Sequence, residues 1–287
     1  MIPTPFDYQA PATLEEAVSL LASNPDGARV LAGGHSLIPA MKLRLAQPQL
    51  LVDIARIKSL AYIREAGDQI LIGATTTHYQ LESSDVLQQL CPLLSDCARS
   101  IGDVQVRNKG TIGGSLAHSD PAADWPAAIL ALEANLVVVG PNGERTVEAE
   151  NFFVNLLTTD LQPGEILREI RIQKPAGRFG QAYQKVAHPA SGFAVVGIAV
   201  HLAFNDDGSC KSAGIGVTGV GTKAYRAKAV ETALAGTTLD DNAIATAVTH
   251  VCDGIDPRTD LYASGEYRCH LAQVHARRAI QAAKTKR

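Results

Sequence analysis

Two short glycine-paired segments, Leu31-Ala32-Gly33-Gly34-His35-Ser36 and Thr111-Ile112-Gly113-Gly114-Ser115, carry most of the information in this 287-residue chain. A glycine pair permits positive φ angles and lets a ligand approach the main chain closely. The flanking hydroxyls of Ser36, Thr111 and Ser115 add donors for an anion. One such pair is typical of a tight turn or a helix cap. Two pairs, each beside a hydroxyl, predict instead that backbone amides of both loops form one cradle for a diphosphate.

The surrounding sequence predicts helices and strands that deliver each segment as a loop. Thr13 and Glu16 have the spacing of a capping box at the start of a helix over 14–22. Residues 29–32 are typical of a buried strand that leads into the first glycine pair. Ser36 is expected to cap the helix that follows this pair. Further strands are predicted over 50–54, 60–64, 69–73, 136–139, 145–147 and 166–172. The strand over 166–172 has the alternation of an exposed strand. Helices are predicted over 79–90, over 92–101 and in a segment that begins with 119–124.

The length favours two domains, and the irregular stretch 173–178 is the predicted boundary. Beyond it the pattern changes to strands first and helices afterwards, which is an α+β arrangement rather than alternating βαβ units. The predicted strands cover 182–186, 195–204 and 213–220, and the predicted helices cover 223–234, 241–252 and 266–283.

The composition excludes several classes of partner. With 26 basic and 29 acidic residues the formal net charge is -3, so there is no basic footprint for nucleic acid. No apolar run approaches the roughly 20 residues that span a bilayer, and the first residues carry no export signal, which predicts a cytoplasmic protein without a transmembrane segment.

The five cysteines are scattered and odd in number, with no C-x-x-C spacing. This pattern predicts reduced, individually buried thiols rather than disulfides, and it excludes a four-thiolate iron–sulfur cluster of the usual spacing. The histidines form no pair at metal-ligand spacing beyond the loose His270 and His275, so no metal site is predicted.

Neither common phosphate-binding fingerprint is present. The chain has no G-x-G-x-x-G and no G-x-x-x-x-G-K-[ST] in a strand–loop–helix setting. The two glycine loops are therefore expected to hold a dinucleotide between two lobes, with the rest of the ligand lying along the cleft.

The segments that begin at Ala32, Arg107 and Tyr183, the last followed by the 191–195 run, resemble the FAD-binding medium subunit of molybdenum hydroxylases. This family includes the carbon monoxide dehydrogenase flavoprotein and the flavin domain of xanthine dehydrogenase. The resemblance implies FAD-binding lobes of the vanillyl-alcohol-oxidase (PCMH) type over 1–174, divided at about 55, and a smaller α+β domain of the carbon monoxide dehydrogenase flavoprotein type over 179–287.

The resemblance also implies cofactor-binding residues. The diphosphate would lie against Ala32, Gly33, Gly34, His35 and Ser36 and against Thr111, Ile112, Gly113, Gly114 and Ser115, with Asp124 near the ribityl or adenosine portion, Leu167 and Lys185 at the flavin end and Phe193 near the isoalloxazine. The residues alone leave alternatives open: His35 as a residue that orients its loop, Asp124 as a first-turn helix acid, Lys185 as a surface charge and Phe193 as core. Arg107 is either partner-facing or part of a polar loop.

The function that the resemblance implies is electron transfer by a flavin within a heterotrimer, and no catalytic acid or base is predicted in this chain.

 The resemblance implies that FAD here receives electrons from iron–sulfur clusters and passes them to an external acceptor. It places the molybdopterin cofactor on a large partner subunit and 2Fe-2S clusters on a small one, in an assembly expected to be a dimer of heterotrimers. The alternatives are a stand-alone FAD-dependent oxidase or reductase of the same fold and a non-catalytic nucleotide-binding module. The sequence shows no histidine–carboxylate pair in the glycine loops, which disfavours the stand-alone enzyme.

Overall fold

The computed structural model describes residues 1–285 and begins with a small lobe built on a parallel sheet. Its strand order is β1-β3-β2. The elements are β1 (Asp7–Gln9), α1 (Leu14–Ser23), β2 (Ala28–Leu31), α2 (Leu37–Lys42) and β3 (Leu50–Asp53). Thr13 caps α1 as predicted, since its side chain accepts a hydrogen bond from the Glu16 amide. Apolar residues of α1, among them Ala17 and Leu21, share a core with Ala28 of β2 and Val52 of β3, so the helix supports the sheet whose strand β2 leads to the first glycine pair.

The second lobe carries a five-stranded antiparallel sheet in the order β4-β5-β10-β6-β7. The strands are β4 (Ile63–Ala66), β5 (Gln69–Gly73), β6 (Asn135–Gly140), β7 (Gly143–Glu148) and β10 (Ile166–Gln173), preceded by the 3-10 turn η1 (Lys58–Leu60). The expectation that the 166–172 strand is exposed is wrong. β10 pairs on both sides, and Ile166, Leu167, Ile170 and Ile172 are buried. The alternation predicts an exposed strand, but the charged residues pair with one another at the face of the sheet, for example Arg171 with Glu169 at 2.6 Å.

Short helices and turns cover this sheet and pack with it in the largest of three hydrophobic cores. They are α3 (His78–Glu82), α4 (Asp85–Leu90), α5 (Pro92–Arg99), α6 (Val104–Arg107), α7 (Ile112–His118), α8 (Trp125–Ala131) and α9 (Ala149–Phe152), with a small pair of strands, β8 (Phe153–Asn155) and β9 (Thr158–Thr159). The helix predicted over 79–90 is divided in two because Ser84 starts α4 as a new N-cap. The strand predicted over 60–64 begins later because η1 occupies its first residue.

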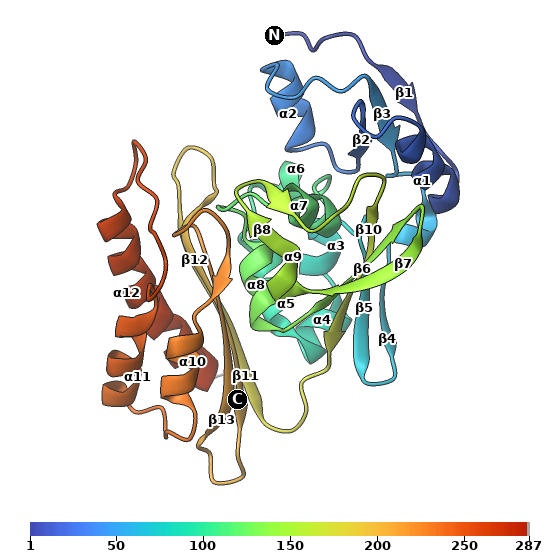
Figure 1. Cartoon of the computed structure of the whole chain (residues 1–287). Coiled ribbons are helices and arrows are strands. Elements are labelled where there is room, and N and C mark those ends of the chain that lie inside the picture. Colours follow the sequence, from blue (N-terminus) through green and yellow to red (C-terminus); the bar gives the residue numbers. More distant parts are fainter. Residues whose placement is uncertain (286–287) are drawn as a thin grey trace.

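The C-terminal part has strands first and helices afterwards, as predicted. Its sheet is β11-β12-β13-β14, and α10, α11 and α12 cover the face that points away from the second lobe (Figure 1). The elements are β11 (Phe179–Ala187), β12 (Ala194–Phe204), β13 (Cys210–Thr218), β14 (Tyr225–Arg226), α10 (Lys228–Leu234), α11 (Asp241–Ala247), η2 (Val248–His250) and α12 (Gly265–Thr285). The helix predicted from 223 begins later because Tyr225 and Arg226 pair with β13.

The other face of this sheet packs closely on α8. A Cβ atom at Gly216 of β13 would lie 1.9 Å from the carbonyl oxygen of Ala127, and one at Gly214 would lie 2.1 Å from that of Ala131. Glycine at these two positions therefore lets the helix backbone rest directly on the strand. This packing fixes the C-terminal sheet against the second lobe, so loops from both can share one site.

The cysteine prediction is wrong for one pair. Cys252 and Cys269 form a disulfide with a Cα–Cα distance of 6.0 Å, whereas Cys91, Cys97 and Cys210 are free and buried as expected. The two bonded residues are 17 positions apart and meet because α12 runs back past the segment that follows η2. Their spacing in the sequence gives no sign of this return.

No helix in residues 1–285 is both long enough and apolar enough to cross a membrane.

Candidate functional site

A cavity of about 410 Å³ lies where the two lobes and the C-terminal sheet meet. Both glycine loops line it, together with a third loop that includes Ser191, Gly192 and Phe193. Of the sequence-predicted site residues only Ile112 and Lys185 are absent from the wall. Ile112 is fully buried in the core of the second lobe, and Lys185 points at Asp124 from behind the wall. The volume is in the range of small-molecule and cofactor sites.

The first glycine loop presents free main-chain donors. Gly34 has φ of 75°, a conformation that favours glycine. Within residues 1–285, no acceptor receives a hydrogen bond from the amides of the 33–36 stretch. Successive free amides of this kind form a concavity that binds anions. The 33–36 stretch therefore has main-chain donors available for an anion, and the diphosphate cradle stays a prediction.

Two side chains of this loop have defined roles. The expectation that Ser36 caps α2 is wrong, because its side chain makes no capping hydrogen bond and its backbone is helical. The Ser36 hydroxyl consequently stays available at the cavity wall. His35 turns back on its own loop, with Nδ1 3.0 Å from the carbonyl oxygen of Gly33. Of the two alternatives for His35, this contact favours orientation of the loop.

In the second glycine loop the amides of residues 112–115 all donate within the protein, unlike those of the first loop. Ile112 donates to the carbonyl of Thr76, and Gly113 donates to that of Ala74 at 2.8 Å. Gly114 donates to the Thr111 hydroxyl at 3.1 Å, and Ser115 donates to the Thr111 carbonyl. Sequence alone does not show that Thr111 is the N-cap of α7 and accepts hydrogen bonds from the amides of Gly114 and Ser115. Along residues 112–115, side chains are therefore the donors that this loop can offer a ligand.

The glycines of the second loop serve close packing instead. A Cβ at Gly113 would lie 2.5 Å from the Cβ of Ala74 and 2.6 Å from its carbonyl oxygen. Across the seam between the lobes, a Cβ at Gly33 would lie 2.2 Å from the carbonyl oxygen of Lys109 and 2.8 Å from the Cα of Gly110. The two loops thus touch through bare main chain, and the cavity depends on that contact.

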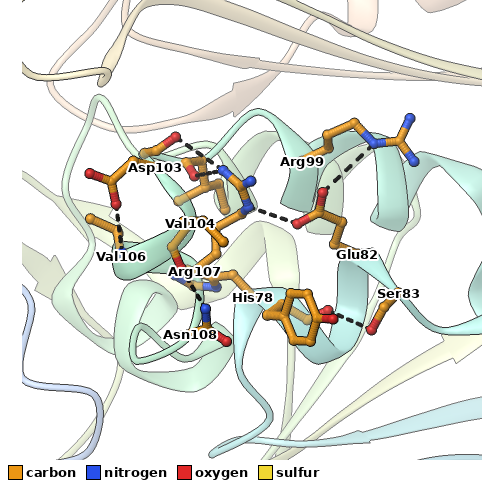
Figure 2. Close-up of polar contacts among 12 residues, drawn as sticks. His78, Glu82, Ser83, Arg99, Asp103, Val104, Val106, Arg107 and Asn108 are labelled. Atoms are coloured by element: carbon orange, nitrogen blue, oxygen red, sulfur yellow. Dashed lines mark hydrogen bonds and ion pairs between the residues drawn. The ribbon is translucent and has the colours of Figure 1, made fainter.

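Arg107 holds the segment that leads into the second loop, and Figure 2 shows its guanidinium turned toward Glu82. Its Nε lies 2.7 Å from the Glu82 carboxylate, and its Nη1 donates to the carbonyls of Ile101 and Gly102. Arg99 approaches the same carboxylate at 3.9 Å. Arg107 is thus an internal organiser of this segment rather than a partner-facing charge, and it positions two residues of the cavity wall.

Asp124 belongs to a buried polar triad at the edge of the cavity. Its Oδ1 accepts from the Tyr183 hydroxyl at 2.6 Å, and its Oδ2 accepts from Lys185 Nζ at 2.9 Å. Lys185 also donates to the carbonyl of Ser100. Burial raises the pKa of Asp124, and the ammonium of Lys185 opposes that rise. Asp124 makes no capping hydrogen bond to α8, and Lys185 is only 6% exposed, so neither the helix-acid nor the surface-charge alternative describes them.

Leu167 and Phe193 supply apolar wall. Leu167 is buried at an irregularity of β10 next to Glu169, where the strand register shifts. Phe193 is 44% exposed, so it is not a core residue. The turn that carries it is closed by a hydrogen bond from the His188 amide to the Phe193 carbonyl. An exposed aromatic ring at the mouth of a cavity can contact a planar ligand.

Sequence reasoning missed His78, which lines the cavity while only 4% exposed. Its Nδ1 accepts a hydrogen bond of 3.0 Å from Nε1 of Trp125. Burial, with smaller contributions from His35 and Arg107, lowers the pKa of His78 to about 4. The signal available in the sequence was the hydroxyl run 75–77 directly before it, since Thr77 caps α3 in a full capping box with Gln80.

The stability of the chain should consequently fall with acidity through His78. The pKa of His78 is lower in the folded chain than in the unfolded chain. Between about pH 6.5 and about pH 4 the unfolded chain therefore binds a proton at His78 that the folded chain does not, and the free energy of unfolding falls as the pH falls through this range. Between pH 7 and pH 5 this group should contribute a loss of about 2 kcal/mol. Urea unfolding of the wild type and of His78→Gln at both pH values measures it. An identical pH dependence in the two proteins would contradict the assignment.

Comparison with known proteins identifies two family models along the chain. Residues 4–175 match the FAD binding domain in molybdopterin dehydrogenase, and residues 181–283 match the CO dehydrogenase flavoprotein C-terminal domain. These matches confirm the predicted resemblance and fold class.

Individual relatives match over nearly their full length. The carbon monoxide dehydrogenase medium chain of Hydrogenophaga pseudoflava is 40% identical over 99% of this chain and 98% of its own. A solved carbon monoxide dehydrogenase structure from the same organism superposes with a TM-score of 0.96 at 42% identity, covering 100% of this chain and 99% of the other. Quinoline 2-oxidoreductase from Pseudomonas putida 86 gives 0.93 at 33% identity, with 99% of each chain covered. The chain therefore belongs to the family of FAD-binding medium subunits of molybdenum hydroxylases.

Proposed function

We propose that this chain binds FAD in the cavity between its lobes and serves as the electron-transfer flavoprotein of a molybdenum hydroxylase assembly. The observation that carries the proposal is the meeting of the free amides of the 33–36 stretch with the second glycine loop in one cavity. We assign the FAD-binding domain to 1–174, with lobes divided at about 55, and the C-terminal domain to 179–287.

The residues of the cavity fit the parts of a dinucleotide. The amides of the first loop and the Ser36 hydroxyl would bind the diphosphate from one side. From the other side the hydroxyls of Thr111 and Ser115 would complete the cradle. Leu167 and Phe193 would flank the flavin ring at the apolar end. Asp124 would accept a ligand hydroxyl on a lone pair that Tyr183 and Lys185 leave free.

The remaining predicted residues would act indirectly. Ala32 would form wall beside the first glycine pair, and Ile112 would anchor the second loop in the core. Lys185 would hold Asp124 in one orientation rather than touch the flavin. The chain would thereby bind and orient the cofactor and exclude water from it.

Bound FAD supplies exchange of one or two electrons, which suits a junction between single-electron carriers and an external acceptor. We propose that a small subunit with 2Fe-2S clusters delivers the electrons and that a large subunit with the molybdopterin cofactor oxidises the substrate. A dimer of such heterotrimers is the proposed assembly. The substrate pocket would then lie outside this chain, so its own cavity carries no substrate specificity.

Purification of this chain, alone and co-expressed with its neighbouring subunits, tests the proposal. We expect visible flavin absorbance that acid extraction identifies as FAD, and co-purification of chains that hold molybdopterin and 2Fe-2S. Substrate turnover by the lone chain would favour the stand-alone oxidase or reductase. Absence of FAD from both preparations would refute the assignment and favour a non-catalytic nucleotide-binding module.

A further inference from the structure

His78 occupies a position where the cradle lacks donors. The amides of Ile112, Gly113, Gly114 and Ser115 are all donated inside the protein, so residues 112–115 of the second glycine loop offer no main-chain N–H to a diphosphate. A diphosphate bound between the two loops therefore needs side-chain donors from the second lobe. His78 belongs to the same wall, and its backbone amide donates to the carbonyl of Gly110 at 3.0 Å.

The tautomer of the His78 ring follows from its partner. An indole Nε1–H is a donor only, so the Trp125 contact requires a lone pair on His78 Nδ1. The proton of the neutral imidazole is then on Nε2. Within the described residues Nε2 makes no hydrogen bond to the protein, and it is not one of the buried side-chain atoms that lack a partner. Since His78 lines the cavity, this edge of the ring is open to a ligand there.

Nε2 lies at the seam between the two loops. A Cβ at Gly110 would lie 2.6 Å from it, so glycine at that position keeps the edge of the ring uncovered. Gly110 is also the residue against which Gly33 packs across the seam. The unpartnered N–H therefore lies beside Gly110, the residue that Gly33 of the first loop contacts.

From this geometry we propose that His78 donates a hydrogen bond from Nε2 to the diphosphate of FAD, with Trp125 as the positioning residue that fixes its tautomer. The inference rests on the proposed FAD function and deepens it. The neutral ring supplies a donor of fixed direction, complementing the amides of the first loop. Burial keeps the ring neutral at physiological pH, since the pKa of His78 is lowered to about 4.

Three single variants and one double variant of the full chain, co-expressed with its partner subunits, test the proposal by FAD affinity. His78→Phe retains a ring but no donor, and we expect it to weaken FAD binding by about 10- to 100-fold, the value of a hydrogen bond to a charged group. His78→Gln restores an N–H and should recover most of the affinity. Trp125→Phe should weaken binding in the wild type but not in the His78→Phe background, because its effect passes through the histidine.

Two NMR measurements separate this contact from a structural role. In the ¹⁵N-labelled wild type the His78 ring should show a protonated Nε2 whose signal moves when FAD is added. At saturating protein, the ³¹P signals of FAD should differ between the wild type and His78→Phe, while the flavin absorbance spectrum stays the same. Equal FAD affinity in His78→Phe and the wild type would overturn the inference. An Nδ1–H tautomer of His78 in the wild type would also overturn it.

Failure of this inference and failure of the proposed function give different results. A wild-type chain without FAD affinity would refute the function. A wild type that binds FAD, with unaltered affinity in His78→Phe, would refute only the His78 contact. If His78→Phe does not fold, the ¹⁵N measurement on the wild type still decides the question.

Discussion

Valine at both Gly33 and Gly113 is expected to abolish FAD binding, with less than about one tenth of the wild-type flavin content remaining. At each position the first side-chain carbon already meets backbone atoms, at 2.2 Å from Lys109 for Gly33 and at 2.6 Å from Ala74 for Gly113. Because backbone cannot move aside as a flexible side chain does, Gly33 must separate from Lys109 across the seam, and α7 must move away from Ala74. The free amides of the first loop would then no longer face the second lobe.

The matched control is the pair Gly67→Val and Gly143→Val. Both control glycines have positive φ, and a Cβ at either meets nothing within 4 Å. Valine there should cost on the order of 1–3 kcal/mol per site through backbone strain. Flavin content per folded chain, with folding checked by circular dichroism, compares the two variants. Full flavin in the Gly33 and Gly113 variant, or equal loss in the control, would refute the role of the seam.

The position of the site was predictable from the sequence because glycine pairs and hydroxyls are local signals. The 31–36 and 111–115 segments do line one cavity. The division of labour between them was not predictable. Whether an amide is free depends on acceptors elsewhere in the chain, and here Ala74 and Thr76 take the amides of the second loop.

Other differences also arise from contacts between distant residues. The alternation of residues 166–172 predicts an exposed strand, because nothing local shows that β5 and β6 pair on the two sides of β10. The Cys252–Cys269 disulfide depends on the return of α12. His78 carries no motif of its own, and its place in the site follows from the Trp125 contact and from the packing of Gly110.

The buried Asp124–Lys185 pair leads to the second large expected effect, a loss of about 3–5 kcal/mol in the free energy of unfolding for Lys185→Met. The side chains of Asp124 and Lys185 are 4% and 6% exposed. Removal of the ammonium leaves a carboxylate in a dry environment with Tyr183 as its remaining side-chain donor. Urea unfolding at neutral pH measures the loss. The double variant Asp124→Asn with Lys185→Met removes both charges and should be more stable than Lys185→Met alone.

A lysine from an exposed pair provides the control that identifies burial as the cause. Lys174 contacts Glu65 at 2.6 Å, but the two side chains are 24% and 49% exposed. Lys174→Met should therefore cost no more than about 1 kcal/mol, because water already screens that pair. Equal losses for the two lysines, or additive effects in the Asp124 and Lys185 double variant, would contradict a coupled buried pair. Since Asp124 also lines the cavity, Lys185→Met should weaken FAD binding as well, whereas Lys174→Met should leave it unchanged.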